Sequence, residues 1–248
     1  MNPASYIFPD WPCASHVKSV ITTRHGGVSH EGYASFNLAD HVGDDPEAVK
    51  YNRKQLRVDL ELPTEPCWLQ QVHGTRVINA GSPVEGLEAD GSFALQPGVV
   101  CAVMTADCLP VLLSDREGTR VAALHAGWRG LAAGILEQGV EVLGVSPEQL
   151  LAYLGPAIGP RAFEVGDEVR HAFVDQDPKA AEAFQPAGSG KWMADIYLLA
   201  HQRLNARGLE NIHGGGRCTF QEDAEFFSYR RDKTCGRMAS LIWIDKTG

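Results

Sequence analysis

Three apolar runs, each about the length of one strand, follow one another closely in the middle of this chain, at 99–105, 110–114 and 120–124. Short continuous apolar runs bounded by turn residues are typical of buried strands. The polar stretch at 115–119 reads as the turn between the second run and the third. The sequence therefore predicts three neighbouring buried strands in this region.

Helices are predicted on both sides of these strands. Asp45 followed by Pro46 is typical of a helix start, and this helix is expected to run to about Leu60. A second helix is expected to begin near Leu131 and to end at about 143–144, where a glycine stops it. The remaining predicted elements are helices at 165–173 and 195–207, two strands around a turn within 68–78, strands at 151–154 and 240–244, and a polar Gly/Pro loop at 185–191, the best place for mobility.

The order of these elements indicates the fold class. Strands mix with helices without a strict alternation, which favours a mixed α/β (α+β) fold over a doubly wound parallel sheet. We expect a single layered sandwich domain over residues 1–248, with mixed sheets flanked by helices. A chain of this length can bury most of its apolar surface without disulfides or structural metals.

Charge and composition argue against several classes of partner. The net charge is −9, which argues against a broad nucleic-acid footprint. No apolar run approaches the ~18 residues of a membrane span, and residues 1–6 lack the features of a signal peptide. Six cysteines without regular spacing are typical of reduced thiols in a cytoplasm. The expected location is therefore cytoplasmic, and the sequence carries no signal for the oligomeric state.

Three potential metal ligands lie at the ends of strand-like runs: His73, Cys108 and His125. Two imidazoles and one thiol, with a fourth position left open, are the usual make-up of a catalytic zinc site. A soft His/His/Cys set also binds copper. Cys108 with His125 equally fits a cysteine nucleophile with a histidine base. The residues by themselves leave these alternatives open.

The segments that carry these residues resemble the laccase-domain family, also called the YfiH or PgeF (peptidoglycan editing factor) type. The resemblance rests on His73-Gly74, on Ala-Asp-Cys-Leu-Pro-Val at 106–111 and on His-Ala-Gly-Trp-Arg-Gly at 125–130. It extends to segments at 24–29, 36–38, 154–159, 163–166 and 227–231, and so covers nearly the whole chain.

The resemblance implies a fold, a metal and a set of activities. The implied fold is a layered, YfiH-like α/β sandwich, and the implied zinc ligands are His73, Cys108 and His125. The family is associated with phosphorolysis of adenosine, inosine and methylthioadenosine, with adenosine deamination, with polyphenol oxidation and with editing of peptidoglycan precursors. One departure concerns Gly91, because the family often has Ala after Glu-Ala-Asp; we expect Gly91 to loosen the loop that carries Asp90.

Each chemistry needs further residues. For deamination, zinc makes hydroxide available near neutral pH, and Asp90 or Glu164 could relay protons beside Cys108 and His125. Phosphorolysis needs a phosphate site, for which arginine is well suited. The predicted substrate-binding residues are Arg24, Arg129 and Arg230 for phosphate, Asn37 for a base or ribose, and Tyr229 for stacking on a purine, with Phe36 as an alternative; Arg231 is expected to form an ordinary salt bridge.

Two motifs are missing from the chain. Laccase chemistry proper uses a blue copper and a three-copper cluster, commonly held by His-x-His pairs, and none of the nine histidines forms such a pair. The zinc-deaminase motif, His-x-Glu with Pro-Cys-x-x-Cys, is absent as well. We therefore favour a zinc-dependent enzyme that acts on a purine nucleoside and phosphate. The alternatives are a copper-dependent polyphenol oxidase and a cysteine hydrolase for peptidoglycan precursors.

Overall fold

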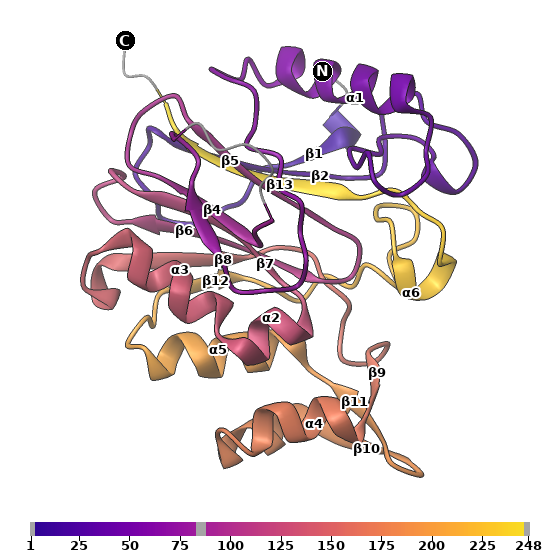
Figure 1. The fold of residues 1–248 in the computed structure, drawn as a ribbon, viewed down its shortest axis with the longest axis vertical. Helices are drawn as coiled ribbons and strands as arrows, with labels where there is room; N and C mark the ends of the chain where they lie inside the picture. Colours follow the sequence, from indigo (N-terminus) through magenta and orange to yellow (C-terminus); the bar gives the residue numbers. More distant parts are fainter. Residues whose placement is uncertain (1–2, 83–87, 246–248) are drawn as a thin grey trace.

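Two sheets packed on each other form the centre of the molecule, with helices outside both (Figure 1). This computed structural model describes residues 3–82 and 88–245. The predicted mixed α/β fold with helix-flanked mixed sheets is confirmed.

The larger sheet is mixed and the smaller one is antiparallel. The six-stranded sheet has the order β12 (Ile212–Gly214), β8 (Leu150–Leu154), β6 (Leu109–Asp115), β7 (Val121–Ala126), β4 (Gly91–Ala94) and β3 (Val77–Asn79), with parallel pairs at both edges. The four-stranded sheet has the order β1 (Tyr6–Ile7), β2 (Val17–Thr22), β13 (Met238–Ile244) and β5 (Val100–Thr105). The last strand of the chain thus lies between two early ones.

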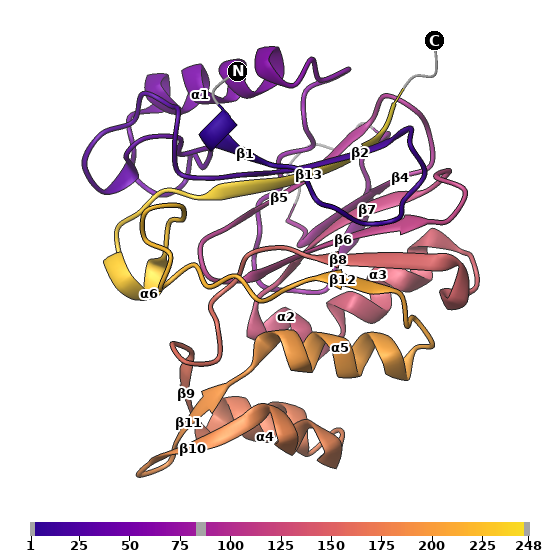
Figure 2. The ribbon, with the colours of Figure 1, turned by 180° about the vertical axis from the view of Figure 1, so that it is seen from behind.

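Helices cover the outer face of each sheet. Helix α1 (Pro46–Asp59) lies over the four-stranded sheet, while α2 (Trp128–Ala133), α3 (Ile135–Leu143) and α5 (Ile196–Ala206) lie on the opposite side, beyond the six-stranded sheet. A small sheet of β10 (Phe184–Gly188), β11 (Lys191–Ala194) and β9 (Glu164–Gly166) carries α4 (Asp167–Val174) at the end of the molecule far from α1 (Figure 2). The short helix α6 (Tyr229–Asp232) precedes β13, and 3-10 turns occur at Pro3–Ser5, Glu31–Tyr33, Pro147–Gln149 and Pro178–Ala183.

The side chains of β6 and β7 alternate between two apolar layers. On β7, Ala122 and Leu124 pack with the helices, whereas Val121 and Ala123 face the four-stranded sheet. Because successive side chains of a strand point to opposite faces, His125 lies on the same face as Val121 and Ala123. The alternation therefore directs this predicted ligand into the space between the sheets.

Several predicted elements are confirmed, and four differ. The three central strands, the helix after Asp45 and the final strand form as expected. Residues 68–72 form no strand and make a single bridge, Gln70 to Glu88. The helix expected from about 131 to 143 is divided at Gly134, whose φ is +106°. A strand precedes α4, and the loop expected at 185–191 is instead the hairpin of β10 and β11, with Gly188 and Gly190 at positive φ.

In the part of the chain that the structure describes, none of the helices is both long enough and apolar enough to cross a membrane.

Gly91 does not loosen a loop, so that prediction is wrong. It begins β4, is buried, and pairs with Leu124 of β7. A Cβ at this position would lie 2.7 Å from Leu124 Cδ2 and 3.1 Å from Val77 Cγ2. Glycine is required here because two neighbouring side chains occupy the space of a methyl group.

Gly91→Ala should therefore destabilise the protein by about 1–3 kcal/mol, the usual range for overpacking a core. The measurement is the free energy of unfolding in urea. Gly81→Ala is the matched control, because a Cβ there would come no closer than 3.3 Å to the nearest side-chain atom and the residue is exposed. Equal stabilities for the two variants would contradict this account of β4.

Candidate metal centre

Strand register brings Cys108 and His125 together. Strands β6 and β7 are antiparallel, with Pro110 opposite His125 and Leu109 opposite Ala126. Cys108 immediately precedes β6 and His125 is the penultimate residue of β7, so both lie at the same end of the sheet. Cys108 and Pro110 are two residues apart and share a face, which is the face of His125.

His73 reaches this place through a turn that Asp90 organises. The Asp90 carboxylate accepts hydrogen bonds from the backbone N–H groups of Val72 (3.2 Å), His73 (2.9 Å) and Gly74 (2.7 Å). His73 itself has φ +61°, in the left-handed region that non-glycine residues adopt uncommonly. Asp90 directly precedes β4, which pairs with β7. The turn is therefore anchored beside the strand that carries His125.

The three donor atoms lie close enough for one metal ion. Candidate ligand atoms of His73, Cys108 and His125 all lie within 4.8 Å of one another, and Cys108 Sγ is 3.8 Å from His73 Nε2. Zn–N and Zn–S bonds of about 2.1 and 2.3 Å at a tetrahedral angle put two donors about 3.6 Å apart. The donor set thus fits zinc after a small closure. Of the two histidines, His73 is exposed and His125 is buried, so the group is reached by solvent at His73.

Asp90 also orients His125, the buried candidate ligand. His125 Nδ1 donates to Asp90 Oδ1 at 2.8 Å, on the assignment of the ring proton to Nδ1, which leaves Nε2 free for a metal. A carboxylate behind a ligating histidine is the usual arrangement in metal centres, because it fixes the tautomer and ring orientation. Asp90 is fully buried, so it acts on the centre through His125 and the His73 backbone.

Electrostatics couple the three ionisable groups. Burial lowers the pKa of His125, but the Cys108 charge and the hydrogen bond to Asp90 outweigh it and raise this pKa to about 9. Burial raises the pKa of Cys108, whereas the charge and hydrogen bonds of the two histidines lower it to about 6. Burial also raises the pKa of Asp90, but hydrogen bonds from His125 and Gly74 hold it below its usual range. The pKa shifts of Cys108 and His125 have a shared cause, because the charged form of each group stabilises the charged form of the other.

A small cavity of about 130 Å³ opens beside Cys108. Its wall is largely apolar and aromatic, and it is lined by Ala106, Asp107, Cys108, Trp128, Ile158, Phe163, Ile196, Tyr229 and Arg230. An apolar lining with a few polar groups is typical of small-molecule sites, but this cavity is smaller than the ~300–1,000 Å³ that is usual for them.

Two predicted substrate residues line this cavity, and a third lies next to it. Tyr229 is half exposed at the cavity. Arg230 Nη1 donates to the Glu164 carbonyl at 2.8 Å, and its guanidinium lies 5.7 Å from the Phe163 ring centroid. The exposed Arg129 stacks on Trp128, with 4.4 Å from its guanidinium carbon to the ring.

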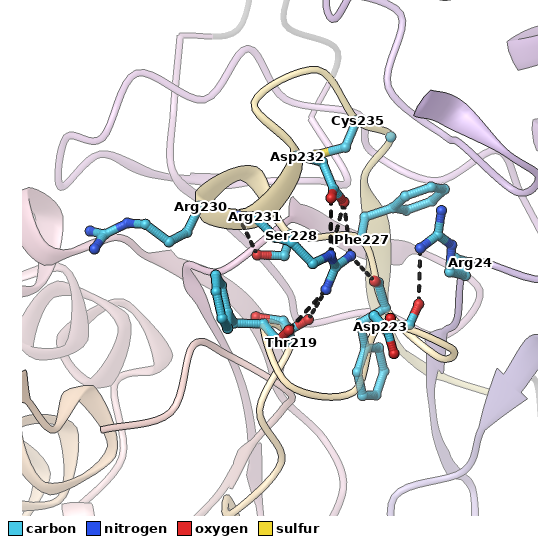
Figure 3. A network of polar contacts seen from close by, with 12 residues as sticks. Arg24, Thr219, Asp223, Phe227, Ser228, Arg230, Arg231, Asp232 and Cys235 are labelled. Carbon is cyan, nitrogen blue, oxygen red and sulfur yellow. Dashed lines mark hydrogen bonds and ion pairs between the residues drawn. The ribbon is translucent and has the colours of Figure 1, made fainter. Parts of the chain in front are cut away.

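Other predicted residues lie elsewhere or are fully engaged. Arg24 donates to the carbonyls of Ala34 and Asp223 and lies over Phe227 (Figure 3). Phe36 is completely buried in the core against Tyr6.

Asn37 is placed differently from its prediction as a ligand of the base or ribose. It is fully buried; its amide donates to Ala39 and Asp44, and its oxygen accepts from Ala39 and Arg237. These bonds fix a loop and occupy the polar atoms of the side chain. Asn37 therefore has a structural role.

Arg231 forms the ordinary ion pair that was expected, with Asp232 at 2.8 Å. It also donates to the carbonyls of Thr219, Phe220 and Phe226. Figure 3 shows Arg231 inside this network and Arg230 pointing away from it. The two neighbouring arginines thus differ in what they can do, and only Arg230 reaches the cavity.

Two residues at the centre escaped the sequence reasoning. A Cβ on Gly127 would lie 2.7 Å from His73 Cδ2 and 3.1 Å from Cys108 Sγ, so only glycine leaves room for the ligands. Asp107 has φ +89° immediately before Cys108. The available signals were a glycine between a ligand and a helix start, and an aspartate, which tolerates the left-handed region better than most residues.

Comparisons with known proteins find relatives that match nearly the whole chain. Residues 18–245 match the sequence model of a family described as multi-copper polyphenol oxidoreductase laccase. The chain is 56% identical to "Purine nucleoside phosphorylase PA4543" of Pseudomonas aeruginosa, over 97% of this chain and 98% of the relative. It is also 56% identical to "Purine nucleoside phosphorylase YfiH" of Escherichia coli, over 96% and 98%. The crystal structure of Neisseria meningitidis protein NMB0706 superposes with a TM-score of 0.95 at 51% identity, covering 98% of this chain and all of that one.

The pKa of His125 predicts how metal affinity depends on pH. A protonated imidazole cannot ligate a metal, so zinc must displace the proton that His125 holds below its pKa of about 9. Zinc affinity should therefore fall as the pH is lowered from 9, by about tenfold per pH unit for one proton. Below the Cys108 pKa of about 6 the fall should steepen, because the thiol protonates too.

Competition with a chelator across this pH range measures the effect. Asp90→Asn should weaken zinc binding by about 10–100-fold at pH 9, the usual loss when the partner of a ligating histidine is changed. Affinity that does not change with pH would show that His125 is not a ligand.

Proposed function

The chain belongs to the family described as multi-copper polyphenol oxidoreductase laccase, and from that premise we propose that it is a zinc-dependent purine nucleoside phosphorylase. The observation that carries the proposal is a His/His/Cys donor set, open on one side, beside an aromatic-lined cavity. The names of relatives at 56% identity support the nucleoside substrate.

The donor set argues for zinc over multi-copper oxidation. Laccase chemistry uses a blue copper together with a three-copper cluster. Within residues 3–82 and 88–245, one group of potential ligands was found, and it supplies two imidazoles and one thiol. Copper can occupy such a site, because affinity rises towards Cu(II) in the divalent series. Phenol oxidation by copper bound at this single site is the alternative that the metal content tests.

Phosphorolysis breaks the glycosidic C–N bond and forms a C–O bond to phosphate, releasing the base and ribose 1-phosphate. We assign the aromatic rings of Tyr229 and Trp128 to the purine, since both line the cavity. Arg129 and Arg230 bring positive charge to its edge for phosphate. His73, Cys108 and His125 would hold the zinc ion, which when bound would supply a Lewis acid for the negative charge of the phosphate or of the departing base. Asp90 and His125 hold the centre in place, and we propose adenosine deamination as a second reaction there.

Two broader assignments follow the same proposal. The six cysteines are free thiols, which fits a reducing cytoplasm. Residues 1–248 are assigned to one domain, because β13, near the end of the described chain, pairs with both β2 and β5. Small molecules, a nucleoside and phosphate, are the partners.

Adenosine and inosine should be cleaved faster when phosphate is added, with the base and ribose 1-phosphate as products. Arg129→Ala should raise the phosphate concentration needed for half-maximal rate by about tenfold or more, because one charge-assisted contact is lost. Chromatography of products with and without phosphate measures both effects.

Arg76→Ala is the matched control for the arginine variant, because Arg76 is exposed and donates to the Glu88 carbonyl away from the cavity. Product formation that ignores phosphate and yields only inosine from adenosine would replace phosphorolysis with hydrolytic deamination. Release of no product from either nucleoside would contradict the nucleoside proposal.

A cysteine hydrolase is the second candidate, and a specific observation favours it. Cys108, His125 and Asp90 form a chain of thiolate, imidazole and carboxylate, the arrangement that activates a nucleophile in acyl-transfer enzymes. Its substrate would be an aminoacyl or peptidoglycan-precursor bond. In that enzyme His73 has no chemical role.

His73→Ala therefore separates the two candidates. If His73 is a metal ligand, His73→Ala should lower both zinc content and nucleoside cleavage. The loss should be at least about 10–100-fold, the usual cost of changing a residue that only supports a ligand. Cys108→Ala combined with His73→Ala should cost little more than either change alone, since both act through one metal ion. Undiminished hydrolysis of an aminoacyl substrate by His73→Ala at low zinc content would support the hydrolase instead.

A further inference from the structure

Asp107, the residue before Cys108, holds an unfavourable backbone conformation. Its φ of +89° lies in the left-handed region. A residue other than glycine keeps such a conformation only where its surroundings impose it. Contacts around Asp107 must therefore hold its backbone in this conformation.

Three segments distant in sequence converge on Asp107. Its Oδ1 accepts from Thr219 Oγ1 at 2.6 Å, and its Oδ2 accepts from the backbone N–H of Arg230 at 2.6 Å. Its carbonyl accepts from the backbone N–H of Ile158 at 2.9 Å. Hydrogen bonds to an ionised carboxylate are shorter and stronger than neutral ones. The side chain thus holds two points of the C-terminal segment against the start of β6.

The same bonds build the wall of the cavity. Arg230, held by its backbone at Asp107, reaches on through its side chain to the Glu164 carbonyl. Tyr229, Arg230 and Cys108 line the cavity, and Asp107 itself lies in the same wall. The Asp107 carboxylate therefore connects the segment of the candidate ligand Cys108 with the residues that form the wall of the cavity.

We propose that Asp107 is a positioning residue that couples the Cys108 ligand to the Tyr229–Arg230 wall, so that metal affinity and substrate affinity depend on the same side chain. The metal half of this inference needs only the His73/Cys108/His125 centre. The substrate half rests on the proposed nucleoside activity. With both oxygens of Asp107 engaged by the protein, the residue acts through its neighbours.

Two substitutions separate the side-chain bonds from the backbone conformation. Glycine adopts positive φ without cost, so Asp107→Gly relieves the strain but removes both side-chain bonds. Asparagine tolerates the same region and keeps the shape, with an oxygen to accept from Arg230 N–H and an amide that can donate to Thr219 Oγ1. If the bonds matter, Asn should rescue and Gly should not. If only the backbone matters, Gly should be harmless.

The experiment measures zinc affinity by chelator competition and the steady-state kinetics of nucleoside cleavage at saturating zinc. Asp107→Gly should weaken zinc binding by about tenfold or more and raise the KM by about tenfold, with a smaller change in kcat. Asp107→Asn should stay within about threefold of the native protein in both. Thr219→Val, which removes one of the two bonds, should weaken zinc binding by an intermediate factor.

Glu61→Gly is the control for the removal of strain, since Glu61 is exposed, has φ +49°, and lies outside the centre. Its zinc affinity should equal that of the native protein. Thermal unfolding reports whether each variant folds. If Asp107→Gly is unfolded, Thr219→Val carries the test, and native zinc affinity in that variant overturns the proposal.

Native zinc affinity and KM in folded Asp107→Gly would likewise overturn the coupling. A native protein that binds zinc but cleaves no nucleoside contradicts the proposed function while the zinc data still decide the role of Asp107. A native protein that binds no zinc overturns both.

Discussion

The buried carboxylate of Asp90 is the interaction on which the rest of the centre depends. It accepts three backbone N–H groups from the turn at Val72, His73 and Gly74, and the ring N–H of His125. A buried charge is costly unless hydrogen bonds compensate it, and here four donors do so. One anion thereby orients two of the three candidate ligands.

Strand register and the free volume beside Gly127 determine the position of the third candidate ligand, Cys108. Antiparallel pairing sets Cys108 at the same sheet end as His125, and the absence of a side chain at Gly127 leaves the volume that both His73 and Cys108 occupy. Interiors packed at this density do not tolerate an extra methyl group cheaply. The geometry of this centre therefore depends on residues other than the three candidate ligands, and a sequence motif of ligands alone describes only part of it.

The features readable from the sequence were those that local pattern determines. Continuous apolar runs predicted the central strands, and Asp45-Pro46 predicted the start of α1. The three proposed ligands followed from their residue types and a family resemblance. Long-range contacts determined the features that the sequence did not predict. Asn37 is polar and lies in a segment that resembles the family, yet its polar atoms are engaged in hydrogen bonds that fix its own loop. The segment at 185–191 forms most of a hairpin whose strand β11 pairs with β9, and no local pattern indicates that pairing. Asp107 and Asp90 acquire their roles from segments far along the chain.

The state of the Cys108 thiol tests the central claim most directly. A metal-bound thiolate is deprotonated and occupied, so in zinc-loaded protein Cys108 should resist iodoacetamide, and removal of the metal by a chelator should expose a fast-reacting thiol with its pKa lowered to about 6. Peptide mapping by mass spectrometry follows the site, with the half-buried Cys13 as an internal comparison whose rate should not depend on metal. Rapid alkylation of Cys108 in the zinc-loaded protein would contradict its assignment as a ligand.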